Sequence, residues 1–213
     1  MNTGWELVER VVLQQTVPLP AEWHLASGQG LRSNGGPESL KAVGGAGELL
    51  MATEQPLKQD QQGLLRRLRW QPDRRGGLVA RHLQPLAIPT GHWGLTDRLV
   101  GAAGQPNLRL LGLWRRFEAP STRQTRLVPS PWPADRADAG PLAPRKQWDL
   151  GRLGLPADNR EVLLAGPPLA DGRPSVVLGS DDNFNPLQAS HQAGLTPRRT
   201  AACRRETHAA TAP

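Results

Sequence analysis

The chain has 213 residues, a formal net charge of +7 and one cysteine, Cys203. The length favours a single domain, and one cysteine excludes an intrachain disulfide. With 21 prolines and 23 glycines the composition is loop-rich, and no apolar run or N-terminal leader pattern predicts a membrane span or a signal peptide.

Short apolar runs separated by turn residues follow one another along the chain. The runs are Leu7 to Leu13, Glu48 to Thr53, Leu64 to Trp70, Gly77 to Leu83, Leu108 to Trp114, Glu161 to Leu164 and Ser175 to Leu178. Turn signals such as Asp171-Gly172 stand between them. No segment keeps a helical spacing, and only a short helical turn from Glu38 to Val43 stays open as an alternative. The pattern predicts an all-β protein, built as a sandwich, a barrel or a propeller.

A loose repeat occurs three times within this pattern. In each copy an acidic residue stands before a small apolar patch, a glycine-containing turn follows, and an apolar strand then closes on a second acid. The leading acids are Glu38, Asp97 and Glu161, and the closing acids are Glu54, Glu118 and Asp181. The leading acids are 59 and 64 residues apart, a spacing that admits a four-stranded propeller blade with its loops.

The run from Ser175 to Leu178 leads into a dense cluster of side-chain oxygens. Its members are Ser180, Asp181, Asp182, Asn183 and Asn185. Carboxylates and amides at the end of a strand are suited to a hard cation or to the surroundings of a phosphate ester. A simple polar turn is the alternative interpretation, because Asp and Asn are common turn residues.

Other chemistries find little support in the sequence. The five histidines lack the paired spacing of a zinc site, and no Gly-x-Ser-x-Gly elbow or phosphate-binding glycine loop occurs. The basic residues are dispersed, without interleaved aromatic residues or a zinc-finger or RNA-binding signature. Nucleic-acid binding is therefore disfavoured, although a basic nucleic-acid- or partner-binding protein stays an alternative.

Three segments resemble the phytase-like family, whose domain is described as having the esterase-like activity of phytase. The strongest is DNREVLLAGPPLADGRPSVVLGSDDNFNPLQ at Asp158 to Gln188, and the other two are Ser33 to Asp60 and Leu110 to Leu127. The resemblance covers about Gly28 to Gln188. It implies a partial β-propeller-like array of antiparallel strands and an exported or periplasmic bacterial protein. It starts inside the family domain, so we expect an N-terminally truncated copy.

The resemblance also suggests a division of the chain and a function. We expect an N-terminal strand or linker at 1–27, the partial propeller at 28–195 and a disordered basic tail at 196–213. The implied function is hydrolysis of a small-molecule phosphate or other ester, with Ca²⁺ as a candidate cofactor. A non-catalytic or decayed propeller-type domain of the same ancestry is the alternative. The sequence does not indicate an oligomeric state.

The same resemblance suggests which residues form the site. A cation held by carboxylates would neutralise a phosphate group and activate water, and an arginine fork fits phosphate oxygens. The candidate catalytic residues are Glu38, Glu161, Asp181 and Asp182. The candidate metal ligands are Asp181, Asp182, Glu54 and Glu118. The candidate substrate-binding residues are Arg116 and Asn183.

Overall fold

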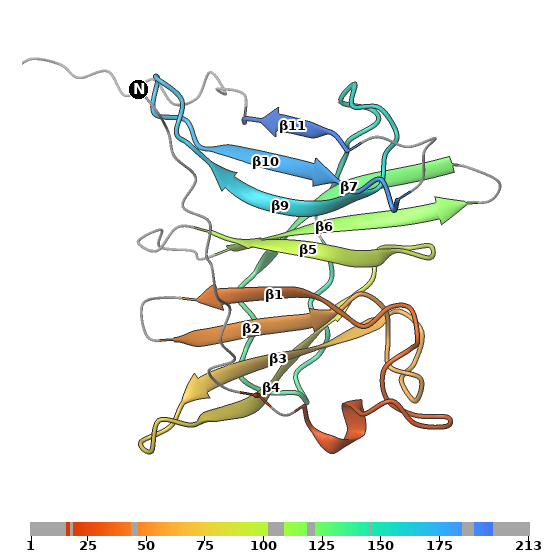
Figure 1. Cartoon of the computed structure of the whole chain (residues 1–213), viewed down its shortest axis with the longest axis vertical. Helices are drawn as coiled ribbons and strands as arrows, with labels where there is room; N and C mark the ends of the chain where they lie inside the picture. Colours follow the sequence, from red (N-terminus) through yellow and green to blue (C-terminus); the bar gives the residue numbers. More distant parts are fainter. Residues whose placement is uncertain are drawn as a thin grey trace, which may run out of the picture.

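The computed structural model describes residues 16–17, 19–43, 47–101, 109–118, 122–144, 146–184 and 190–197 (Figure 1). Within these residues the chain forms eleven strands and one short 3-10 turn at Ala21–Trp23. The strands are β1 (Pro37–Val43), β2 (Glu48–Thr53), β3 (Leu64–Pro72), β4 (Leu78–Ala87), β5 (Gly94–Val100), β6 (Arg109–Glu118), β7 (Thr122–Pro131), β8 (Trp148–Asp149), β9 (Arg160–Gly166), β10 (Ser175–Ser180) and β11 (Gln192–Leu195). The all-β prediction is thus confirmed, and the segment left open as a helical turn is strand β1.

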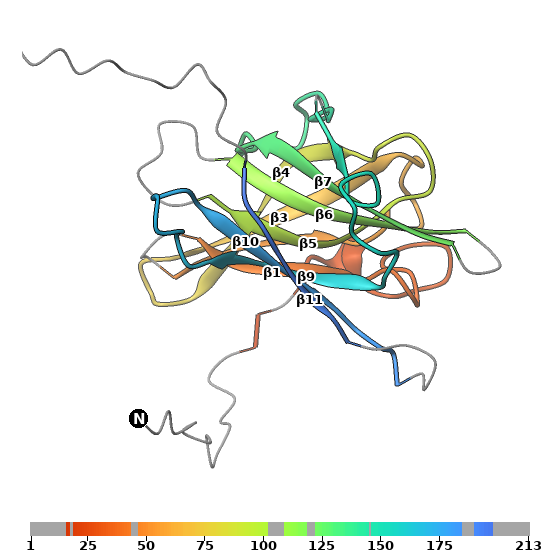
Figure 2. The same cartoon turned by 90° about the horizontal axis from the view of Figure 1, so that it is seen from above.

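The strands form three antiparallel meanders, which we call blades 1, 2 and 3. Blade 1 has the order β1-β2-β3-β4, blade 2 the order β5-β6-β7-β8, and blade 3 the order β9-β10-β11. Strand β1 lies against β5, and β5 lies against β9, so the first strands of the three blades are neighbours (Figures 1 and 2). This stacking of meanders around their first strands is a partial propeller-like array.

The sequence repeat corresponds to the blade. Its leading acids Glu38, Asp97 and Glu161 all lie on the first strands β1, β5 and β9. The apolar runs that follow are the second strands β2, β6 and β10. The predicted run from Leu7 to Leu13 and most of the predicted tail, from 198 onwards, lie outside the described residues.

Apolar side chains fill the spaces between the blades. Blades 1 and 2 share a cluster that includes Ala52, Leu65, Trp93 and Trp114, and blades 2 and 3 share one around Leu113, Leu127, Leu163 and Leu178. The other face of blade 1 is covered by the chain that precedes it, through Val17, Leu19, Trp23 and Leu31. The strands thus bury their apolar faces blade against blade, as stacked sheets require.

Polar side chains join the three first strands to one another. Asp97 on β5 is 5% exposed, and its carboxylate accepts hydrogen bonds from Lys41 Nζ on β1 at 2.9 Å and from the Leu163 amide on β9 at 2.8 Å. The Thr96 hydroxyl donates to the Arg160 carbonyl on β9 at 3.2 Å. The buried Arg98 donates from Nε to the Ser39 hydroxyl on β1 at 3.0 Å. These bonds fix the relative positions of the blades.

Two buried arginines lie on the interface of blades 1 and 2. Ser39, Ala52 and Arg67 form one cross-strand row of blade 1, and all three are fully buried. Burial lowers the pKa of Arg98 to about 10, and burial together with the charge of Arg98 lowers the pKa of Arg67 to about 9. The interface therefore carries positive charge in a poorly solvated place.

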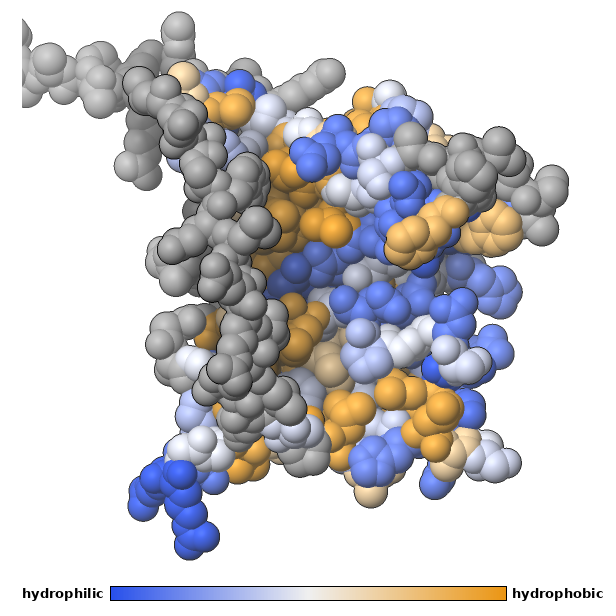
Figure 3. Space-filling model, viewed as in Figure 1, coloured by the Kyte–Doolittle hydropathy of each residue, from blue (hydrophilic) through white to orange (hydrophobic). Residues whose placement is uncertain are grey.

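Some apolar side chains on the first strands are exposed. Leu40 lies on β1, and Val162 and Leu164 lie on β9. The space-filling view shows hydrophobic patches interrupted by hydrophilic surface (Figure 3). In the described part of the chain, no helix has the length and apolar character needed to cross a bilayer.

Candidate active site

The candidate site lies at the end of the blades where the first strands begin. Each second strand runs antiparallel to its first strand, so the ends of β2, β6 and β10 lie at the same end of the molecule, on the right in Figure 1. Residues that start or end these six strands are therefore brought together from distant parts of the sequence. The closing acids of the repeat are among them.

A cleft of about 1090 Å³ opens at this end, slightly above the range of about 300–1,000 Å³ that is common for small-molecule sites. Its lining is rich in charge and comes from all three blades and the loops between them. The charged members are Arg32, Glu38, Glu54, Arg115, Arg123 and Glu161. Asn34, Gln55, Gln62, His92, Trp93, Asn159 and Asn183 contribute further polar or aromatic surface.

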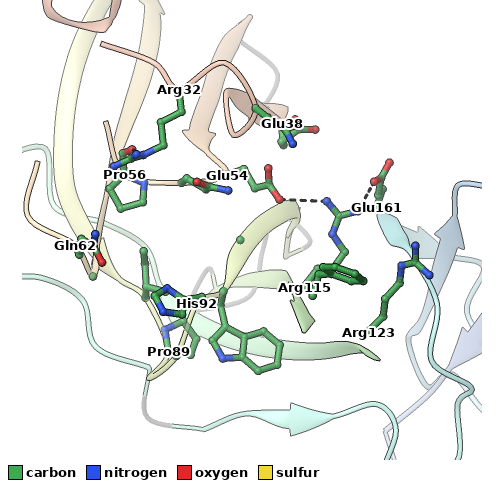
Figure 4. A pocket seen from close by; sticks show the side chains of 18 of the residues that line it. Arg32, Glu38, Glu54, Pro56, Gln62, Pro89, His92, Arg115, Arg123 and Glu161 are labelled. Atoms are coloured by element: carbon green, nitrogen blue, oxygen red, sulfur yellow. Dashed lines mark hydrogen bonds and ion pairs between the residues drawn. The ribbon is translucent and has the colours of Figure 1, made fainter. Parts of the chain in front are cut away.

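Arg115 organises the carboxylates of the cleft (Figure 4). Its Nη2 lies 3.2 Å from Glu54 Oε1, and its Nη1 donates to Glu161 and to the Asn159 side-chain carbonyl. Asn159 in turn donates from Nδ2 to Glu161 Oε1 at 2.9 Å and to the Asp181 carbonyl at 3.3 Å. One guanidinium thus holds acids from blades 1 and 3 in fixed positions, as charge-assisted bonds do well.

Glu38 is the cleft acid with a raised pKa. Its side chain reaches the open cleft, yet partial burial raises its pKa above the ordinary 4.5, and the nearby charges of Glu54 and Glu161 raise it further. The charge of Arg115 acts in the opposite direction without cancelling the shift. A carboxyl that keeps its proton longer than usual is suited to act as a proton donor.

Backbone geometry explains how Glu54 reaches the cleft. The chain leaves β2 at Thr53, and the Glu54 carbonyl accepts a hydrogen bond from the Leu95 amide of β5 at 3.0 Å. Gly94 begins β5 directly beside it, and a Cβ there would lie 2.5 Å from Glu54 Oε1. The carboxylate therefore occupies the space that a larger residue at 94 would take.

Strand alternation decides which arginine of the Arg115-Arg116 pair enters the cleft. Arg115 and Phe117 point to the same face of β6 and both line the cleft, as successive odd positions of a strand must. Arg116 lies outside the lining, where it pairs with Glu118 and lies over the Trp93 ring at 5.5 Å.

A comparison with protein families bears on these residues. The family described as Phytase-like, esterase-like activity of phytase, matches residues 6–184. The chain belongs to this phytase-like family. No curated protein and no solved structure matches it significantly. The match includes every charged residue of the cleft, so the site is part of the family domain.

Four of the residues proposed from the sequence line the cleft of this phytase-like domain. They are Glu38, Glu54, Glu161 and Asn183. Asp181 and Asp182 do not line it: Asp181 bonds through its backbone to Asn159, and Asp182 Oδ1 accepts the Phe184 amide at 2.9 Å. Glu118 and Arg116 pair with each other outside the lining.

The residues described here do not assemble the calcium site that the resemblance implied. No three His, Cys, Asp or Glu side chains in the described ranges come close enough together to hold a metal ion. Of the four candidate ligands, Glu54 is engaged by Arg115 and Glu118 by Arg116. This donor set does not fit Ca²⁺, which takes six to eight oxygen ligands, and we derive no step through a metal.

Several cleft residues were not predicted from the sequence. Arg115 stands next to the predicted Arg116, and Arg123 lies in the resembling segment Leu110 to Leu127 but was not singled out there. Arg32 and His92 come from segments without a motif. Arg115 could have been found from its spacing of two residues from Phe117 at the end of an apolar strand, since this spacing places both side chains on one face. Arg32, fixed by a 2.9 Å bond from Nε to the Pro56 carbonyl, has no comparable signal.

Proposed function

We propose that the chain hydrolyses phosphate monoesters in this cleft, with Glu38 as the proton-transferring group. The observation that carries the proposal is the combination of a carboxyl of raised pKa with three arginines in one cleft of the phytase-like domain. The family description supports an ester substrate.

The charges of the cleft favour an anionic ester when Glu38 is protonated. Arg115 then pairs with both Glu54 and Glu161 and offsets one of their two negative charges. Arg32 and Arg123 offset the other and leave the lining with a small excess of positive charge. A planar guanidinium can form two parallel hydrogen bonds to phosphate oxygens. A protonated Glu38 therefore has two effects: it supplies a proton, and it removes a negative charge that would repel the phosphate.

Hydrolysis would break the bond between phosphorus and the leaving oxygen while the oxygen of a water molecule forms a new bond to phosphorus. Glu38 would give its proton to the leaving oxygen and regain one from the attacking water. Arg115 would act as a positioning residue that keeps Glu54 and Glu161 in place. General acid catalysis of this kind contributes about 10²–10⁴-fold to a rate.

The test is hydrolysis of para-nitrophenyl phosphate by the wild-type chain, Glu38→Gln and a matched control, Glu22→Gln. Glu22 pairs with His82 and does not line the cleft. We expect Glu38→Gln to lose about 10²-fold or more in kcat/KM and Glu22→Gln to keep the wild-type value.

Two results would contradict the proposal. Turnover of para-nitrophenyl acetate without turnover of the phosphate would make the chain a carboxylic esterase. No turnover of either ester by a folded chain would favour the non-catalytic propeller domain.

A further inference from the structure

The phenylalanines of the chain are placed differently from four of its tryptophans. Trp23, Trp70, Trp93 and Trp114 are buried in the packed core. The chain has two phenylalanines and no tyrosine, and both phenylalanines are exposed: Phe117 by 56% and Phe184 completely. Exposing a large apolar ring forgoes the stabilisation that burial would bring.

Both exposed rings belong to the end of the molecule that carries the cleft. Phe117 lies near the end of β6 and lines the cleft. Phe184 follows β10 and is the neighbour of Asn183, which also lines the cleft. Two apolar rings therefore stand beside a cleft whose lining is otherwise mostly charged and polar.

The turn that carries Phe184 has an unusual backbone. Asn183 and Phe184 have φ values of 52° and 54°, the only non-glycine residues with positive φ among those described. Asn tolerates this conformation, but a bulky residue such as Phe rarely adopts it. The bond from the Phe184 amide to Asp182 Oδ1 holds the turn at 2.9 Å. Strained backbone of this kind is often associated with function.

A cation stands directly beside the first ring. Arg123 pairs with Phe117 across β6 and β7, its guanidinium lies 5.7 Å from the ring centre, and it lines the cleft. A ligand that places an anion near Arg123 and an apolar ring near Phe117 would satisfy both neighbours. Aromatic pairs add to the binding gained from area alone.

We propose that the cleft selects aryl esters, with Phe117 and Phe184 contacting the aromatic ring of the alcohol portion while its phosphate lies among the cleft arginines. This inference rests on the proposed function and specifies its substrate class. Hydrolysis of such an ester releases a phenol, whose oxygen receives the proton from Glu38, and inorganic phosphate, which retains the oxygen of water.

The test separates ring recognition from turnover. Benzylphosphonate and methylphosphonate share one anionic group and differ in the ring, and neither is hydrolysed as an ester. Titration calorimetry measures their affinities for the wild-type chain, for Phe117→Ala and Phe184→Ala, and for Leu169→Ala as a control. Leu169 is an exposed apolar residue in the turn between β9 and β10, away from the cleft lining.

We expect the wild-type chain to bind benzylphosphonate about 10-fold more tightly than methylphosphonate, the scale of one well-placed apolar contact. Each phenylalanine variant should lower this ratio several-fold, and Leu169→Ala should preserve it. Equal affinities in the wild-type chain, or a ratio unchanged in both phenylalanine variants, would overturn the inference. Ring-selective binding without ester turnover would overturn the proposed function and leave ring recognition standing.

Discussion

Replacing Asp97 by alanine is expected to destabilise the fold more than the same replacement of an exposed acidic residue. The Asp97 carboxylate joins the first strands of all three blades. It accepts hydrogen bonds from Lys41 Nζ on β1, from the Arg98 amide on its own strand β5, and from the Leu163 amide on β9. Its removal leaves the fully buried Leu163 amide without this acceptor and Lys41 without its partner.

The size of the effect follows from the burial of these groups. Removing one partner of a buried ion pair costs about 3–5 kcal/mol, and an unsatisfied buried donor alone costs about 1–3 kcal/mol. Since about 1 kcal/mol shifts the Tm of a domain of this size by about 2–4 °C, Asp97→Ala should lower the Tm by roughly 6–20 °C.

Thermal unfolding followed by circular dichroism and tryptophan fluorescence measures this shift. Asp135→Ala is the control, because the Asp135 side chain is 47% exposed and pairs with Arg69 at 3.0 Å. An exposed pair contributes about 0–1 kcal/mol. Equal Tm losses in the two variants would refute the conclusion that Asp97 fixes the three blades relative to one another.

Three further predictions concern the cleft and its surroundings. The pKa of Glu38 is raised, so the folded state holds its proton more tightly and loses stability as pH rises from about 4.5 through the folded pKa. The pKa of Glu48 is lowered by hydrogen bonds from Gln71 and Arg69, so Glu48 adds stability that is lost as pH falls below 4.5. At neutral pH Glu38→Gln should therefore raise the Tm and Glu48→Gln should lower it, and shifts of the same sign would contradict this assignment. Gly94→Ala should displace the Glu54 carboxylate and reduce ester turnover with a small Tm change; full activity would show that the Glu54–Arg115 pair is dispensable. Because the candidate ligands do not assemble, the melt should be the same in Ca²⁺ and in chelator, whereas a higher Tm in Ca²⁺ would reveal a metal site.

The strands and the repeat were predictable where local pattern and tertiary packing agree. Strands β2, β6 and β10 are apolar and flanked by turn residues, and each was expected near its observed bounds. Strand β5 was recognised only in part, because its middle, Thr96-Asp97-Arg98, is polar and buried. Those side chains are satisfied by bonds to β1 and β9, which no local pattern reveals.

Strand β7 was not predicted at all. It carries Pro129 and Pro131, which usually argue against a strand, and it pairs with β6 along its whole length. The apolar partner strand and the buried Leu127 and Val128 outweigh the local preference.

The candidate site was predictable to the extent that the repeat placed its acids at strand ends. Glu38, Glu54 and Glu161 meet because the three blades begin at one end of the molecule. The choice between Arg115 and Arg116 depended on which face of β6 turns to the cleft. Leu113 and Trp114 are both buried, so burial does not alternate there, and the two-residue spacing of Arg115 from Phe117 is the one local indication of this face. At the oxygen cluster, Asp182 Oδ1 accepts the Phe184 amide within a turn, and neither Asp181 nor Asp182 lines the cleft.

The most direct test of the account is the pH dependence of kcat/KM for para-nitrophenyl phosphate in the wild-type chain and in Glu38→Gln. If Glu38 donates the proton, the wild-type profile falls at a pH above the ordinary glutamate value of 4.5 as this carboxyl ionises. The Glu38→Gln profile should be lower and lack that fall. A wild-type profile that Glu38→Gln reproduces in height and shape would contradict the assignment of this cleft as the active site.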